Sequence, residues 1–189
     1  MLRWLDHDHC GDECGARGSR RCRPWLGLLG LSSAVLASLP ITTAAVANGV
    51  PPQYLPIEAR WCFSKPVCIE LEVADESDEQ RLGLMQRPAL PPMRGMWFPF
   101  SRPQPLKFWM HRCIAPLDML FIRDNTLIAI HEEVPICPSL PCPSYGADVD
   151  GDGRIDLADG VIELRAGEAK RLGLQVGDVV IIERLTPAR

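Results

Sequence analysis

The sequence predicts a mainly β fold, a sandwich or partly closed barrel of about seven short strands with two short helices. Glycine (15 residues) and proline (18 residues) are frequent enough to disfavour long helices and to suggest many turns. Short segments alternate between apolar and polar residues with a period of two, which is typical of half-buried strands. Apolar residues make up 47% of the chain and charged residues 23%, the balance of an ordinary globular protein.

The clearest strand is Val67–Val73, in which apolar residues alternate with cysteine and glutamate. Asp75 or Ser77 is then expected to cap a short helix that ends near Met85. Gln80 stands three residues after Ser77, as in a capping box.

The remaining elements follow the same pattern of short apolar segments between turn residues. Asp124-Asn125 connects two of these strands, and this dipeptide favours positive φ and therefore a tight hairpin. A second short helix is expected at Ala166–Leu172, where Gly173 would end it. The further expected strands are Met96–Phe100, Leu106–Met110, Leu117–Arg123, Thr126–Val134, Val161–Arg165 and Val179–Leu185.

Residues 1–47 have the pattern of an export signal, with arginines before the apolar run Trp25–Leu39 and the small-residue site Ala45-Val46-Ala47 after it. The run is shorter than the roughly 20 apolar residues of a membrane span, so we do not expect it to stay as a membrane anchor. Cleavage is expected after Ala47 and would remove the run from the mature protein. Residues 48–60 are expected to form a proline-rich linker before a single β-rich domain at 61–189. The sequence thus predicts an exported protein, periplasmic or extracellular.

The net charge of -4 argues against nucleic acid as a partner, because nothing concentrates positive charge against phosphates. Eight cysteines are present, and those outside the predicted signal are expected to form disulfides in an oxidising compartment. Several pairings are open. Spacing favours Cys62 with Cys68 and Cys137 with Cys142, which leaves Cys113 as a free thiol or a small buried hydrophobe.

An ordered series of short motifs runs through the predicted domain: Gly83-Leu84-Met85, Gly95-Met96, Phe108-Trp109-Met110, Pro116 to Ile122, Val134-Pro135, Pro141 to Tyr145, Glu163-Leu164, Ala166-Gly167, Gly173-Leu174 and Gly177-Asp178. The series resembles the bacterial and archaeal family called domain of unknown function 192, over about Val67 to Leu185. The resemblance implies a small, mainly β, often exported protein and implies no activity. The chain departs from the family pattern at Cys113 and at residues 148–159.

Residues 148–159 have the spacing of an EF-hand or dockerin-like calcium loop. Oxygen-bearing side chains stand at positions 1, 3, 5, 9 and 12, and Gly153 stands at position 6, where such loops turn. We therefore expect Ca²⁺ to stabilise the domain here, the alternative being a solvated acidic turn. The expected ligands are Asp148, Asp150, Asp152, Asp156 and Asp159, with the backbone carbonyl of Arg154.

Catalytic candidates are few, and the sequence contains no serine elbow, phosphate loop or zinc-protease motif. Asp118 interrupts an apolar strand and would support acid–base chemistry if His111 or His131 lay beside it, as in a small hydrolase. Alternatively Asp118 is structural. We therefore expect a non-enzymatic binding or accessory module of the envelope, whose partner is a small molecule or an envelope component.

A copper(I)-handling protein is a further alternative, because methionines gather in one stretch of the sequence with two histidines and Cys113. Core packing by a flexible side chain explains the same methionines more simply. The aromatic residues of this stretch would likewise line either a pocket or a core. The residues concerned are Met85, Met93, Met96, Met110, Met119, Trp97, Phe98, Phe100, Phe108 and Trp109.

Overall fold

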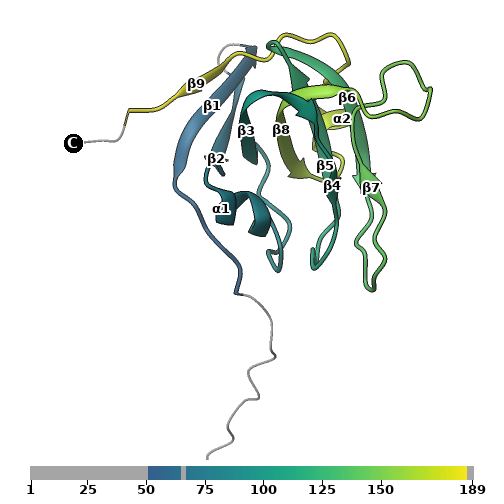
Figure 1. Cartoon of the computed structure of the whole chain (residues 1–189). Helices are drawn as coiled ribbons and strands as arrows, with labels where there is room; N and C mark the ends of the chain where they lie inside the picture. Colours follow the sequence, from purple (N-terminus) through teal and green to yellow (C-terminus); the bar gives the residue numbers. More distant parts are fainter. Residues whose placement is uncertain (1–50, 65–66, 187–189) are drawn as a thin grey trace, which may run out of the picture. The chain divides into compact units, whose positions relative to one another are not determined.

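The computed structural model describes residues 51–64 and 67–186, so the predicted export signal at 1–47 lies outside the described residues. The described chain is mainly β with two short helices, as predicted (Figure 1). The strands are β1 (Ile57–Ser64), β2 (Val67–Val73), β3 (Arg94–Pro105), β4 (Phe108–Trp109), β5 (Leu117–Arg123), β6 (Thr126–Val134), β7 (Ser144–Tyr145), β8 (Leu157–Arg165) and β9 (Ile182–Arg184), and the helices are α1 (Ser77–Leu82) and α2 (Glu168–Leu172).

Seven strands form one mixed sheet in the order β6-β5-β8-β3-β2-β1-β9, and β4 pairs with β7 in a separate ribbon. β2 and β3 are parallel, whereas the other neighbours in the large sheet are antiparallel. The segment before β9 reaches the β5–β6 hairpin, where Val180 N donates to Asn125 O at 2.8 Å and Leu127 N donates to Asp178 O at 2.9 Å. These bonds bring the two edges of the sheet toward each other without closing it into a barrel.

Alternation along the central strands divides the core into two clusters, because successive side chains of a strand point to opposite faces. On β5, Met119 and Phe121 belong to one cluster, and Leu120 and Ile122 belong to the other. The first cluster includes Leu84 from the turn after α1. The second includes residues of α2 such as Ala169. The sheet is therefore covered on both faces.

The first strand begins earlier than the sequence predicts. β1 starts at Ile57, inside the segment 48–60 that was expected to be a linker, and Ala59 and Trp61 are fully buried. The apolar alternation of this strand crosses the expected boundary at residue 61, and the prolines before it obscured that pattern.

Several further elements differ from the predicted bounds. β3 and the ribbon strand β4 replace the two aromatic strands expected at 96–100 and 106–110, and β3 continues through its prolines to Pro105. The capping box of α1 is formed by Glu76 and Glu79, one residue before the expected pair Ser77 and Gln80. A carboxylate cap supplies the same acceptor as a hydroxyl cap, so the helix forms at the predicted place.

The β5–β6 hairpin has the predicted bounds and the predicted turn. Asp124 and Asn125 adopt φ of 49° and 58°, so both connecting residues are left-handed, as a tight two-residue turn requires. The strands on either side end at Arg123 and begin at Thr126.

Asp118 ties two separate segments, the end of β6 and the beginning of α2, to the centre of the sheet. Its carboxylate is fully buried and accepts hydrogen bonds from the backbone N–H groups of Glu133 (2.8 Å), Gly167 (3.0 Å) and Ala169 (2.8 Å). Glu133 lies near the end of β6, whereas Gly167 and Ala169 lie at the beginning of α2. The three donors compensate for the burial of the carboxylate, which therefore holds the hairpin and the helix in place.

Replacing Asp118 with asparagine is expected to lower the free energy of unfolding by about 2–4 kcal/mol, because an amide supplies one acceptor oxygen for three buried donors. Urea unfolding at neutral pH measures the change. Glu132→Gln, at an exposed position on β6, serves as the matched control and should stay within about 0.5 kcal/mol of the wild type. Equal stabilities of the two variants would contradict the anchoring role.

Candidate functional site

A cavity of about 690 Å³ opens between α1 and the segment that leads from β3 into β4. Its walls are mainly apolar, formed by Leu82, Met85, Phe100, Phe108 and Trp109. Its rim is basic and carries Arg81, Lys107 and Arg112. Apolar walls with a few charged groups are typical of small-molecule sites.

A second, narrow cavity of about 40 Å³, the recess, lies beside the first. The recess adjoins the outer cavity, with which it shares the lining residues Gln80, Arg81, Leu82, Met85, Phe108 and Trp109. The residues that it adds are Gly83, Leu84, Phe98, Cys113 and Glu163. The recess therefore reaches from the surface to β8 at the centre of the sheet.

Strand register places Glu163 at the bottom of this recess. Glu163 on β8 stands opposite Met96 on β3 and Met119 on β5. Directly paired residues share a face of the sheet, so the carboxyl group lies between two fully buried thioethers. Glu163 itself is 5% exposed.

Glu163 differs from the other buried carboxyl groups of the described residues in having no hydrogen bond or ion pair within the protein. Asp118 has its three backbone donors. Glu72 accepts from both terminal nitrogens of Arg87 at 2.6 and 2.9 Å. Glu168 pairs with Arg171 at 2.7 Å. The oxygens of Glu163 are not fully enclosed, unlike Nε of Arg87, which is the enclosed side-chain polar atom without a partner among the described residues. A carboxyl group that lacks a protein partner and faces a cavity marks a candidate functional site.

Burial without a partner favours the neutral acid at Glu163. Desolvation raises the pKa of this carboxyl from 4.5 to about 8. The neighbouring thiol of Cys113 is also affected, because burial and then the charge of Glu163 raise its pKa from 9.0 to about 12. Cys113 is therefore a protonated thiol near neutral pH, a state in which it is a poor nucleophile.

Gly83 leaves the approach to Glu163 open. A Cβ atom at this position would lie 3.4 Å from the ring of Phe98 and 3.9 Å from Oε2 of Glu163. The residue ends α1 with φ of 46°, a conformation that side chains disfavour. The turn after α1 thus requires glycine, and the missing side chain leaves space over the carboxyl group.

The three predicted catalytic residues do not come together. Asp118 pairs with Leu164, so it points to the face of the sheet opposite Glu163 and the cavity. His111 lines the outer cavity, with its ring centroid 5.1 Å from that of Trp109. His131 forms a hydrogen bond of 2.8 Å with the carbonyl of Gly146.

The methionines of the predicted copper site serve mainly as core. Met96, Met110 and Met119 are buried in the cluster on the cavity face of the sheet. Met85 lines the cavity, and Met93 packs against the other cluster. Core packing thus accounts for the three buried methionines without a metal.

The acidic segment 148–159 connects β7 to β8, and its carboxylates bind nearby or distant backbone N–H groups. Asp148, Asp152 and Asp156 accept from Gly153 (3.1 Å), Arg154 (2.8 Å) and Val149 (2.7 Å) respectively. Asp159 lies on β8 and accepts from Asp124 N at 3.0 Å, in the β5–β6 turn. Within residues 51–64 and 67–186, no three acidic, histidine or cysteine side chains form a group that would hold a metal. Calcium binding here stays a prediction.

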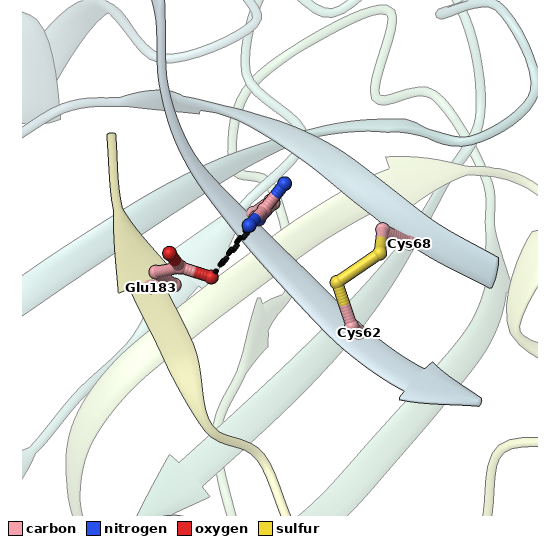
Figure 2. Close-up of a disulfide and its surroundings, with 4 residues drawn as sticks. Cys62, Cys68 and Glu183 are labelled. Atoms are coloured by element: carbon pink, nitrogen blue, oxygen red, sulfur yellow. Dashed lines mark hydrogen bonds and ion pairs between the residues drawn. A yellow bond between two sulfur atoms is a disulfide. The ribbon is translucent and has the colours of Figure 1, made fainter. Parts of the chain in front are cut away.

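Two disulfides join the pairs that spacing favours. Cys62–Cys68 links positions that face each other on β1 and β2, and Cys137–Cys142 closes a proline-rich turn. Figure 2 shows the first bridge beside Glu183 of β9, whose carboxylate pairs with Arg60 of β1 at 2.9 Å. The bridges indicate an oxidising compartment. The described helices are all too short to cross a membrane.

Comparison with known proteins identifies the family of the domain. The family model DUF192, described as "Uncharacterized ACR", matches residues 62–182. The chain belongs to this family. A solved structure from Sinorhizobium meliloti 1021, provisionally described as a transcription regulator, is 31% identical with a TM-score of 0.53, over 67% of this chain and 92% of the other. A protein of unknown function from Novosphingobium aromaticivorans is 25% identical with a TM-score of 0.52, over 71% and 94%. No curated protein matches significantly.

Sequence reasoning missed Glu163 as a site residue of this DUF192 domain. Glu163 interrupts the apolar run Val161–Leu164, as Asp118 interrupts the strand 117–122. The same signal was therefore available for both residues. The pattern leaves open which carboxyl group has partners, because that depends on loops distant in sequence.

Glu163 is expected to make the DUF192 domain less stable as the pH rises. Its pKa is 4.5 in an unfolded chain and about 8 in the fold, so the folded state holds a proton that the unfolded state has lost. The free energy of unfolding should fall between these two pH values, by roughly 3–5 kcal/mol, and stay level above them. Urea unfolding at pH 5, 7 and 9 measures this fall.

Glu163→Gln should remove this slope, because the amide does not titrate. Glu183→Gln, at an exposed position, should retain the wild-type slope. Parallel stability curves for the wild type and Glu163→Gln would show that the carboxyl group is satisfied in the folded protein.

Proposed function

We propose that this protein is a non-enzymatic binding module that takes a small organic molecule into the cavity beside α1. The observation that carries the proposal is the carboxyl group of Glu163, which is buried beside an open cavity and has no partner among the residues that the structure describes. Burying an ionisable group without a partner destabilises a fold. A bound ligand would supply the missing partner and remove that cost.

Recognition fits the cavity better than catalysis does. The high pKa of the Cys113 thiol disfavours a nucleophilic role, and the backbone hydrogen bonds of Asp118 give it a structural role on the opposite face. His111 lies in the outer cavity, where it stacks on Trp109 and faces solvent in part. These positions leave binding as the supported function.

The predicted export signal and the two disulfides support a place outside the cytoplasm, in the periplasm or beyond it. The regulator description of the Sinorhizobium relative is not carried over to this chain. The net charge of -4 would oppose binding to DNA.

Soaking crystals of the protein with a library of small organic fragments tests the proposal. Fragments should accumulate between Leu82 and Trp109 more than at any other place on the surface. Trp109→Ala should reduce the affinity of the best fragment at least about tenfold, whereas Ile181→Ala, at an exposed apolar residue outside the cavity, should leave it unchanged. An empty cavity across the library would refute the proposal.

Calcium stabilisation is a separate part of the proposed function and rests on the spacing of the acidic residues in 148–159. The hydrogen bond from Gly153 N to Asp148 supports it, because position 6 turns back toward position 1. Ion binding to the folded state should raise the melting temperature by several degrees in millimolar calcium over chelator. Asp148→Ala should abolish this rise. An identical melting temperature in calcium and in chelator would remove the calcium site.

A further inference from the structure

We propose that the ligand carries an ammonium group that pairs with Glu163 and an anionic group that lies at the basic rim. This inference rests on the proposed function and names the class of molecule that the cavity would take. The inner end of the cavity, its outer end and the size of the recess each support this class of ligand.

The inner end favours a cation. Glu163 presents a carboxyl group without a partner, and the residues around the recess include the aromatic rings of Phe98, Phe108 and Trp109. The rings of Phe98 and Phe108 stand edge to face with centroids 5.0 Å apart. An organic cation is attracted both by a carboxylate and by the faces of aromatic rings.

The size of the recess suits a small cationic group. Its volume of about 40 Å³ exceeds the roughly 10–15 Å³ that one water molecule needs on the same measure. A primary ammonium group therefore fits this space. Arg81 also lines the recess, but its guanidinium pairs with Asp78 at 3.2 Å, and Gly83 and Cys113 add no charge that competes with the ammonium group.

The outer end favours an anion. Arg81 pairs with Asp78 at 3.2 Å, but neither Lys107 nor Arg112 takes part in an ion pair among the residues that the structure describes. Both side chains line the outer cavity and are exposed at its rim. A carboxylate or phosphate at the far end of the ligand would meet these two positive charges. The apolar walls between the two ends suit an aromatic or aliphatic body.

Binding of an ammonium group displaces the proton of Glu163. The neutral acid loses its proton to solvent as the ammonium group takes its place, so that one positive charge replaces another in the recess. Affinity should therefore be measured near pH 8.5, where the carboxyl group is largely ionised and an alkylammonium group still keeps its proton.

Calorimetry with two isosteric probes tests the inference. The probes are 4-(aminomethyl)benzoate, which has both charges, and 4-(hydroxymethyl)benzoate, which has a hydroxyl in place of the ammonium group. The wild type should bind the amine at least about tenfold more tightly than the alcohol. Glu163→Gln should remove this preference. Lys107→Ala should weaken the binding of both probes, and the matched exposed variant Lys170→Ala should weaken neither.

Proton release in the wild type gives a second readout that needs no variant of Glu163. Binding of the amine should release a proton at pH 7, seen as a dependence of the binding heat on the ionisation enthalpy of the buffer, whereas binding of the alcohol should not.

Equal affinities of the two probes, or a preference that survives Glu163→Gln, would overturn the inference. Failure of both probes, with fragments still occupying the cavity, would also overturn it and leave the binding function in place. An empty cavity in the fragment soak would remove the binding function itself.

Discussion

The pairing of β8 with β3 on one side and with β5 on the other is the constraint on which the rest of the structure depends. It places Glu163 between Met96 and Met119 on one face of the sheet. It places Leu164 beside Asp118 on the other face. A slip of one residue would exchange the faces and bring Glu163 among the aliphatic residues around Leu120. The register thus decides which acidic group lies at the cavity and which lies in the interior.

The two central carboxyl groups have opposite consequences for the fold. Asp118 collects three backbone N–H groups and holds α2 and the end of β6 against the sheet. Glu163 accepts no such hydrogen bond among the described residues, and its raised pKa keeps it mainly protonated at neutral pH. A protein that retains such a group gives up stability at the site where a ligand would restore it. The same sheet therefore carries an acid held by backbone donors on one face and, on the other, an acid that faces the recess.

Alternation and turn chemistry predicted much of the fold, because they act locally. The strands β2, β5 and β6 have the expected bounds, and the Asp124-Asn125 turn has the expected conformation. The boundary of β1 was missed because prolines precede an otherwise regular alternation. The cavity was beyond local reasoning, since it forms between α1, the β3–β4 segment and the centre of β8, which lie far apart in the chain. The aromatic residues were predicted as pocket or core, and Phe98 and Phe108 are both at once.

The pKa of Glu163 tests most directly the claim that this carboxyl group is buried without a partner. Carbon-13 NMR of the side-chain carboxyl groups follows each acid through its own titration, and Glu163→Gln assigns the resonance. A midpoint at about 8 is the result that a buried carboxyl group without a partner predicts. A midpoint near 4.5, the value of a solvated glutamate, would show that Glu163 is hydrated or paired in the folded protein and would contradict the account.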